Sequence, residues 1–485
     1  MKDLLTRHRP IVVLMGIVLV LTFVPVLDIF LGLGSEWRGI PPTFLDESLY
    51  FAHMHAIGEG YVTDGNPYFF EHRYDPPLVI FGGAWLNALP LFAGIPFNVA
   101  LMINFILWSL AFAAILYWLF RELRVPSWVA VFGTVFLYLQ SYVRVWRPVN
   151  LQTIYPFYFL FYIAVIRLVR EQSRTNIILL AVATGASFYL YAYLWQIAVI
   201  TLGLLFLYAL IKKNRSLMRA TLQSSFIGGV IGLPVPLYTL WLSRSSPYFW
   251  ESLGRFGLVN THLPMAEVFY SGGMVGVVLV FLAFLYWRVK ALRSDSEFTM
   301  IWVFLCVSGF GLWIMEGSNL ITGKLFEIGE HIRILILLWL ACTTVLVSTY
   351  LFIHRTLLTR WLQILSFLVV AIGTGISVYY IWYYNYPFVT LQANQELWRA
   401  EQSYAAPFAW LDSVEKNPVV VWSNPRDTLT GLLPIYTKHF TLFVTFGMWH
   451  LMSDNELRER YLVSQYFNNP TADDFHNDRG TYLGR

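Results

Sequence analysis

The feature that most constrains this chain is a series of apolar runs, each about long enough to cross a membrane. A helix needs roughly 20 predominantly apolar residues to cross ~30 Å of hydrocarbon. Eleven runs near this length lie at residues 10–33, 97–120, 127–143, 150–169, 176–190, 194–211, 220–242, 271–288, 299–315, 332–353 and 361–384. The composition agrees, because 57% of the 485 residues are hydrophobic and only 13% are charged. The sequence therefore predicts an all-α polytopic membrane protein with eleven transmembrane helices.

The distribution of positive charge predicts how these helices are oriented. The stretch 78–92 is apolar but short, and glycine, asparagine and proline interrupt it. If it does not cross, loops on the side of the N terminus carry about twice as many Lys and Arg residues as the others, as expected of cytoplasmic loops. We therefore predict a plasma-membrane protein with a cytoplasmic N terminus, in which 78–92 lies along the outer interface as an amphipathic helix. The first loop, 34–96, and residues 385–485 are then both external.

The composition changes after residue 384. Residues 385–485 are more polar, and they alternate helix-like stretches with two strand-like stretches, "PVVVW" and "HFTLFV". Such alternation is typical of a small α/β domain. We therefore divide the chain into a transmembrane domain, 1–384, and an external domain, 385–485. The net charge of +4 comes without a polybasic tract, so we expect no nucleic-acid partner.

The first loop holds an unusual number of acidic residues for a segment between apolar runs. These are Asp46, Glu47, Glu59, Asp64, Glu71 and Asp75. Thr43 and Asp46 fit a capping box, which would give the acid at position 46 a structural role. A second interpretation is functional, because Asp46, Tyr50 and His53 share one face of a helix at offsets of four and seven residues. The sequence by itself leaves both interpretations open.

The order of residues in this loop resembles a known family. An Asp-Glu pair opens the helix "DESLYFAHMHAIGEG", and the loop ends in "RYDPPL". This pattern resembles the GT-C superfamily of integral membrane glycosyltransferases, above all the protein O-mannosyltransferases and the lipid A aminoarabinose transferases. The resemblance covers the first loop and the general layout through about residue 270. The aminoarabinose transferases place a lysine before the proline where this chain has Asp75, and Arg73 lies two positions earlier.

The resemblance implies an activity and a catalytic residue. In this superfamily a sugar carried on a polyprenyl phosphate moves to an acceptor hydroxyl outside the membrane, usually with inversion. Carried over to this chain, the general base is Asp46, with Glu47 as its neighbour. A carboxylate in the first turn of a helix is held ionised by the helix dipole and can accept the hydroxyl proton. We therefore expect a lipid-linked sugar donor, an envelope acceptor and the bilayer as partners.

Further residues are expected to bind the substrates. In the first loop these are Tyr50, His53, His72, Arg73 and Asp75. The leaving phosphate needs cations rather than a general acid, and the external cations are Arg144, Arg147 and Arg333, followed by Lys324, Arg255 and His331. Each of these arginines could instead reach lipid headgroups from an interfacial position.

Metal binding is the weaker interpretation of the same loop. His53, His55, Asp64, His72 and Asp75 could all be ligands, but no pair has a zinc-binding spacing, and the first two histidines point to different helix faces. We therefore expect no metal and no other cofactor.

Two functions from other classes compete with glycosyl transfer. A transporter or flippase of a polyprenyl-linked or anionic precursor would place ionisable residues deep in the spans and use inverted repeats. A non-catalytic envelope-assembly protein would work through residues 385–485 and would leave the acidic first loop unexplained. The sugar, hexose or pentose, the acceptor and the choice between undecaprenyl and dolichyl carriers stay open.

Overall fold

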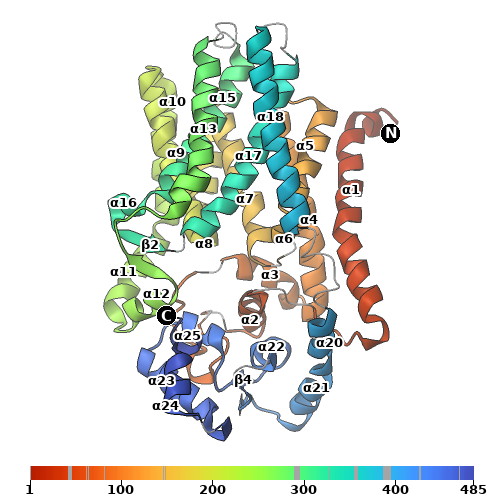
Figure 1. The fold of residues 1–485 in the computed structure, drawn as a ribbon, viewed down its shortest axis with the longest axis vertical. Helices are drawn as coiled ribbons and strands as arrows, with labels where there is room; N and C mark the ends of the chain where they lie inside the picture. Colours follow the sequence, from red (N-terminus) through yellow and green to blue (C-terminus); the bar gives the residue numbers. More distant parts are fainter. Residues whose placement is uncertain are drawn as a thin grey trace.

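The chain folds into a bundle of long helices with a smaller, mostly helical part packed on one end (Figure 1). The computed structural model describes residues 2–484 except 42–45, 62, 64, 81, 146, 148, 289–294, 327, 354–358, 386–394, 425–427 and 469. The N terminus lies at the end of the bundle opposite the C-terminal helices. We call the end that carries the smaller part the site end.

All eleven predicted runs are helical. The bundle helices are α1 (Lys2–Leu33), α4 (Phe97–Glu122), α5 (Ser127–Gln140), α7 (Leu151–Arg170), α8 (Arg174–Leu190), α9 (Ala192–Ile211), α10 (Arg215–Gly232), α11 (Pro234–Ser245), α13 (Ala266–Arg288), α15 (Ser296–Glu316), α17 (Ile328–Ile353) and α18 (Arg360–Tyr380). Within the described residues, eight helices are long and apolar enough to cross a membrane, α10 and α11 form one pair bent by 44°, and α5 and α8 are shorter. The expected all-α, multi-pass architecture is therefore confirmed, and the number of spans stays a prediction.

The bundle has a central helix and loosely held edge helices. In α7, 78% of the residues in its apolar 18-residue stretch are buried. Its tyrosines Tyr155, Tyr158 and Tyr162 lie in the main core. In α18 the buried share is only 11%. Because lipid tails are as apolar as the side chains themselves, an edge helix can leave most of its surface in the hydrocarbon.

Short elements line the site end of the bundle. They are the 3₁₀ turn Gly34–Glu36, α2 (Glu47–Gly58), the 3₁₀ turn Phe70–His72, α3 (Gly82–Phe92), α6 (Tyr142–Val145), α12 (Phe249–Arg255), α16 (Asn319–Thr322), and the antiparallel strands β1 (Leu258–Asn260) and β2 (Lys324–Phe326). The helix predicted in 78–92 is present as α3. Its buried residues, among them Asn87 and Ala88, face neighbouring helices, and its position at a membrane interface stays a prediction.

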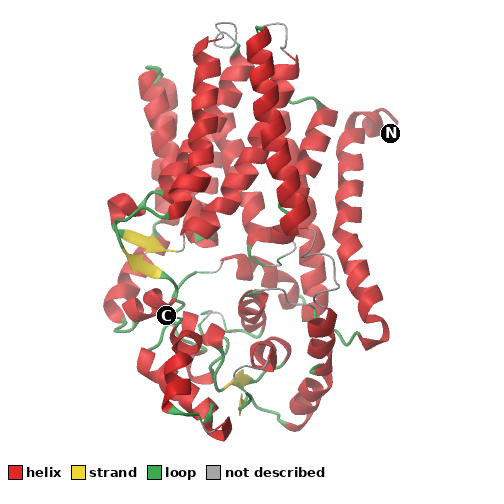
Figure 2. Cartoon of the chain, in the orientation of Figure 1, coloured by secondary structure: helices red, strands yellow, loops and turns green. Residues whose placement is uncertain are grey.

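The C-terminal part is helical, which corrects the expected α/β domain. It contains α20 (Gln395–Ser403), α21 (Ala405–Val414), α22 (Thr428–Tyr436), α23 (Asp454–Ser464), α24 (Ala472–Asn477) and α25 (Arg479–Leu483), with 3₁₀ turns Thr445–Trp449 and Tyr466–Asn468. The two strand-like stretches supply only β3 (Val420–Val421) and β4 (Phe440–Thr441), a parallel pair of two residues each (Figure 2). β4 also bonds to the first loop, because the Thr441 amide donates to the Tyr68 carbonyl at 3.0 Å.

The first loop and the C-terminal part share one hydrophobic core. Phe51 and Met54 of α2 are buried in the same cluster as Leu432 of α22 and Met448. Arg255 of α12, only 3% exposed, donates to the carbonyls of Met448, His450 and Met452 and pairs with Asp454. Side chains from both sides of the boundary predicted at 384/385 therefore pack in one cluster, and the boundary itself stays a prediction.

Candidate functional site

Two adjacent carboxylates and one arginine form the centre of the candidate site. Asp46 and Glu47 open α2, and Arg147 lies between α6 and α7. The Arg147 Nε donates to Glu47 Oε1 at 2.8 Å, and its Nη2 pairs with Asp46 Oδ1. Glu47 is completely buried and Arg147 is 8% exposed, whereas the Asp46 side chain keeps 34% of its surface exposed. The Arg147 guanidinium therefore compensates the charge of the buried Glu47 carboxylate, and Asp46 is the carboxylate that a substrate can reach.

The position of Asp46 separates its two interpretations. Asp46 is the N-cap residue of α2, yet its side chain accepts no capping hydrogen bond from the helix. Its carboxylate is turned to Arg147 instead. Thr43, the other member of the expected capping box, lies outside the described residues. The described contacts thus give Asp46 no capping role.

A strained turn carries Arg147 to the carboxylates. Val149, two residues later, has a φ of +76°, which is unusual for a β-branched residue. Its carbonyl oxygen packs on Gly83 of α3, where an added Cβ would come within 2.7 Å of that oxygen. Strained backbone of this kind persists only where the surrounding contacts hold it, and it concentrates at functional sites.

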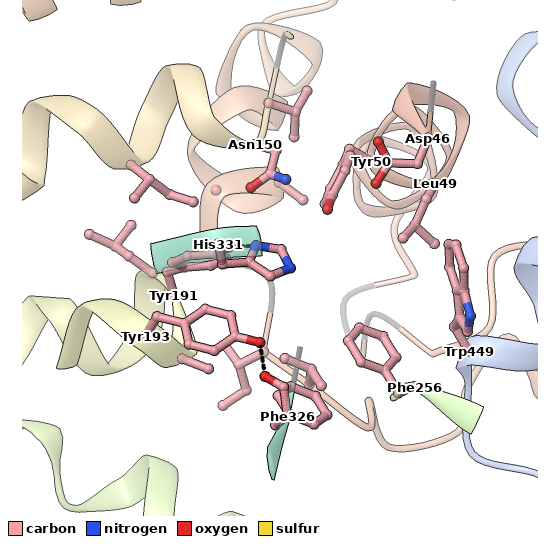
Figure 3. A pocket seen from close by; sticks show the side chains of 18 residues that line it. Asp46, Leu49, Tyr50, Asn150, Tyr191, Tyr193, Phe256, Phe326, His331 and Trp449 are labelled. Carbon is pink, nitrogen blue, oxygen red and sulfur yellow. Dashed lines mark hydrogen bonds between the residues drawn. The ribbon is translucent and has the colours of Figure 1, made fainter. Parts of the chain in front are cut away.

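Asp46 lines a cavity of about 120 Å³ at the site end of the bundle. Asp46 and Tyr50 face it from α2, and Tyr191, Tyr193 and His331 lie across from them (Figure 3). The wall is completed by Asn150, the N-cap residue of α7, and by the rings of Phe256, Phe326 and Trp449. The cavity is therefore built by the first loop, the bundle and the C-terminal part together, and it is mainly aromatic.

His331 is held by two tyrosines, one at the break between α8 and α9 and one in the first turn of α9. The Tyr191 hydroxyl hydrogen bonds to His331 Nδ1, and the Tyr193 ring stacks on the imidazole with centroids 4.8 Å apart. Tyr193 also donates to the Phe326 carbonyl (Figure 3). Burial raises the pKa of Tyr191 well above its usual value. The Tyr191 phenol is therefore neutral at any physiological pH. The ring of His331 points into the cavity (Figure 3).

His72 and Asp75 lie in a second ionic cluster, which joins the first loop to α23. His72 Nδ1 contacts Asp75 at 2.6 Å and its Nε2 contacts Glu456 at 2.7 Å. Arg460 bridges Glu456 at 3.0 Å and Glu71 at 2.8 Å. The hydrogen bonds that His72 donates to the two carboxylates raise its pKa to about 9, and the bond from His72 lowers the pKa of Glu456 to about 2. None of these groups lines the cavity at Asp46.

The other loop residues expected to bind substrate also lie apart from the cavity lining. The Arg73 guanidinium stacks 3.7 Å from the centroid of the Phe70 ring. His53 is 1% exposed, and its Nε2 lies 3.2 Å from Nε2 of His450, itself only 5% exposed. Burial and the neighbouring His53 hold the pKa of His450 well below its usual value. Of the loop residues chosen from sequence, only Asp46 and Tyr50 line the cavity.

The expected cations are distributed over several environments. Arg333 is exposed on α17, two residues beyond His331. Lys324 bonds to Asn260 at 2.5 Å, and Arg255 is committed to the C-terminal part. Arg144 belongs to α6, but its side chain lies outside the described residues. Arg147 is thus the expected cation that the structure brings to the carboxylates.

Among the described residues, no three His, Cys, Asp or Glu side chains come together as a group that could hold a metal ion. Asp64, one of the potential ligands, lies outside them.

Several residues of the cavity were not expected from sequence. They are Asn150, Tyr191, Tyr193, Phe256, Phe326 and Trp449. Tyr191 and Tyr193 had a local signal, because "YLYAYLW" concentrates aromatic residues between two apolar runs. Trp449 had no local signal in the sequence, because its position in the cavity wall depends on how the C-terminal part packs against the first loop.

Comparison with known proteins adds no family. No protein-family model matches the chain, and no curated protein has a significant match to it.

Proposed function

We propose that this protein is a glycosyltransferase that moves a sugar from a polyprenyl-phosphate donor to an acceptor hydroxyl at the site end, outside the membrane. The observation that carries the proposal is the placement of Asp46, a partly exposed carboxylate at the wall of an aromatic cavity beside apolar helices. A lipid-linked donor needs this combination, because its head must react in a polar site while its tail stays in hydrocarbon. The resemblance of the first loop to GT-C enzymes points to the same activity.

In the proposed reaction Asp46 is the general base. Its carboxylate accepts the hydroxyl proton as the acceptor oxygen bonds to the anomeric carbon of the sugar. The bond from that carbon to the phosphate oxygen breaks on the opposite face, which inverts the configuration, and the polyprenyl phosphate leaves as an anion. The reaction needs no further proton donor, because a phosphate is already a stable leaving group.

Arg147 and Glu47 position the base in this proposal. Arg147 fixes the Asp46 carboxylate, and Glu47, buried and held at 2.8 Å, fixes the arginine. A cation beside Asp46 keeps the carboxylate ionised and lowers its intrinsic basicity, so orientation is the main contribution of the pair.

Two groups can stabilise the departing phosphate. His331 faces Asp46 across the cavity. In our proposal the neutral Tyr191 phenol donates to Nδ1, which leaves the Nε2 hydrogen of His331 for a phosphate oxygen. Arg333 is an exposed cation two residues further along the same helix, outside the cavity lining. Each charge-assisted bond of this kind contributes about 1.5–3 kcal/mol.

The proposal is tested by mass analysis of envelope glycans and lipids from cells with and without the gene. We expect one sugar substituent to disappear on deletion and to return with the wild-type gene, but not with Asp46→Asn. The matched control is Glu415→Gln, which should restore the substituent. Glu415 is exposed and lies in the loop after α21. Loss of the substituent together with a lipid-linked precursor retained on the cytoplasmic face would instead identify a flippase, and an unchanged glycan profile would contradict the proposal.

A further inference from the structure

A chain of buried hydrogen bonds joins α3, α4 and α7 next to the candidate site. Asn87 of α3 donates to the Thr153 hydroxyl of α7 at 2.8 Å and to the Gly83 carbonyl at 2.7 Å. The Trp108 indole of α4 donates to Asn87 Oδ1 at 3.0 Å. Thr153 in turn donates to the Val149 carbonyl at 3.1 Å. Asn87 and Thr153 are completely buried, so water cannot replace a partner that either of them loses.

The Trp108 indole fixes the direction of each bond in this chain. An indole N–H can only donate, so it meets the oxygen of the Asn87 amide and not its nitrogen. The amide nitrogen then faces Thr153, whose hydroxyl oxygen accepts from it. The single hydrogen of that hydroxyl is left for the Val149 carbonyl. The chain therefore delivers one hydrogen bond to one backbone carbonyl that precedes α7.

That carbonyl belongs to the strained turn before α7. Val149 has a φ of +76° and precedes Asn150, the N-cap residue of the helix. Two contacts hold its carbonyl oxygen, one with the Thr153 hydroxyl and one with the backbone of Gly83, which leaves no room for a Cβ. A conformation of this kind persists only while its surroundings hold it. Removal of the hydroxyl should therefore let the turn relax toward negative φ.

The turn determines where Arg147 reaches, because Arg147 lies two residues before Val149. Its Nε donates to Glu47 at 2.8 Å, and its Nη2 pairs with Asp46. Within the described part of the chain, the Thr153 hydroxyl bonds to Asn87 and Val149 and to none of these three charged side chains. Any effect of Thr153 on them must therefore pass through the backbone of the turn.

We propose that Thr153 is a positioning residue. Its hydroxyl, directed by Asn87, holds the turn before α7 and thereby sets where Arg147 meets the two carboxylates. A threonine that bonds to the carbonyl four residues earlier is common inside helices and needs no functional role. Here the accepting carbonyl lies outside the helix, in the turn that leads to the site. The consequence for transfer rests on the proposed function, whereas the link from Thr153 to Arg147 does not.

Thermal unfolding of the full-length protein in detergent tests this link without any substrate. Thr153→Val keeps the shape of the side chain and removes the hydroxyl. The ion pair between Arg147 and Glu47 should already be weakened in this variant. Arg147→Met should therefore lower the Tm of Thr153→Val less than it lowers the Tm of the wild type. Equal falls in the two backgrounds would overturn the inference.

The matched control is Thr343→Val. Thr343 is a buried threonine of α17, and its hydroxyl bonds to the Trp339 carbonyl within that helix, at 2.8 Å. In this background Arg147→Met should lower the Tm as much as in the wild type. A reduced fall here as well would show a general effect of lost threonine hydroxyls and would contradict a specific role of Thr153.

Single turnovers with a bound lipid-linked donor test the consequence for transfer. Thr153→Val should slow transfer by about tenfold or more with donor binding unchanged, because the orientation of the base is lost and the binding site is not. A loss of stability alone would reduce the amount of folded protein rather than the rate constant of each turnover. Thr153→Ser keeps the hydroxyl and should recover most of the rate. Equal slowing in both variants would contradict a role of the hydroxyl.

This inference and the proposed function fail differently. Non-additive Tm shifts, with no sugar substituent lost on gene deletion, would retain the positioning role of Thr153 and refute glycosyl transfer. Additive Tm shifts and a normal transfer rate in Thr153→Val, in a protein that Asp46→Asn inactivates, would retain the transferase and refute the positioning role.

Discussion

At the scale of single residues, the most consequential contact is the one between Arg147 and Glu47. Arg147→Met should lower the free energy of unfolding by about 3–5 kcal/mol, because it leaves the fully buried Glu47 carboxylate without its partner. Thermal unfolding in detergent measures this. The double variant Arg147→Met, Glu47→Leu removes both charges and should recover most of the loss. A single variant as stable as the wild type would show that the ion pair does not compensate the burial of Glu47.

The hydrogen bond between Tyr191 and His331 can be tested without changing any charge. Tyr191→Phe should lower kcat/KM by about twofold to tenfold, the value of one neutral hydrogen bond of 0.5–1.5 kcal/mol. Tyr189→Phe is the matched control, because that hydroxyl bonds to the Ile231 carbonyl and does not line the cavity. Equal rates in the two variants would remove His331 from the mechanism.

Sequence reasoning found the residues of this centre but not how they pair. The helix periodicity placed Asp46, Tyr50 and His53 on one face, and the first two do line the cavity. His53 is instead buried against His450, 397 residues away. Arg147 was expected at a phosphate, and its contact with Glu47 spans 100 residues. Such distant contacts depend on the assembled fold, which local patterns do not describe.

At the scale of elements, the ionic cluster between the first loop and α23 makes stability depend on pH. The pKa of His72 is raised to about 9 from 6.5, so its stabilisation is complete below pH 6.5 and is lost as the pH rises through 9. The pKa of Glu456 is lowered to about 2 from 4.5, so its stabilisation is complete above pH 4.5 and is lost as the pH falls through 2. The two windows overlap between pH 4.5 and 6.5.

We therefore expect the Tm in detergent to fall between pH 6.5 and 9, and proteolysis of residues 385–485 to become faster there. His72→Gln should remove this alkaline dependence. His476→Gln is the control, because His476 is an exposed histidine of α24. An identical alkaline fall in the His72→Gln protein would assign the effect to other groups.

The helices of the bundle could be predicted and the C-terminal strands could not, for a physical reason. An apolar run of 20 residues in hydrocarbon has only the helix available, because every backbone group must be satisfied within the segment. A short run such as "PVVVW" can pair with any neighbour, and here only Val420 and Val421 do so, in parallel with Phe440 and Thr441. The adjacent apolar residues Phe443 and Val444 join the core of the first loop instead.

At the scale of the whole molecule, the orientation in the membrane can be measured directly. Cys306 and Cys342, both buried, would first be replaced by alanine. Single cysteines at the exposed positions Thr63 and Asn424 should then react with an impermeant reagent in intact cells. A cysteine at Arg215, exposed at the opposite end of the bundle, should react only after permeabilisation. The reverse pattern would invert the proposed topology.

The composition of the chain did not predict how residues 385–485 pack against the rest of the molecule. The change of composition at residue 385 suggested a separate external domain, yet Trp449 closes the cavity at Asp46 and Arg255 of α12 is buried among the carbonyls that follow Met448. In this account the C-terminal part completes the site, so a chain ending at residue 384 should be inactive even where it folds.

The central claim is that Asp46 takes the proton from the acceptor hydroxyl, and one measurement tests it most directly. Wild-type protein and Asp46→Asn, each purified with its lipid-linked donor, would be compared in single turnovers with the acceptor that the envelope analysis identifies. The substitution keeps the size of the side chain and removes the basic carboxylate. We expect transfer to slow by about 100-fold or more while donor binding is retained. Transfer by Asp46→Asn at a near-normal rate would contradict the account.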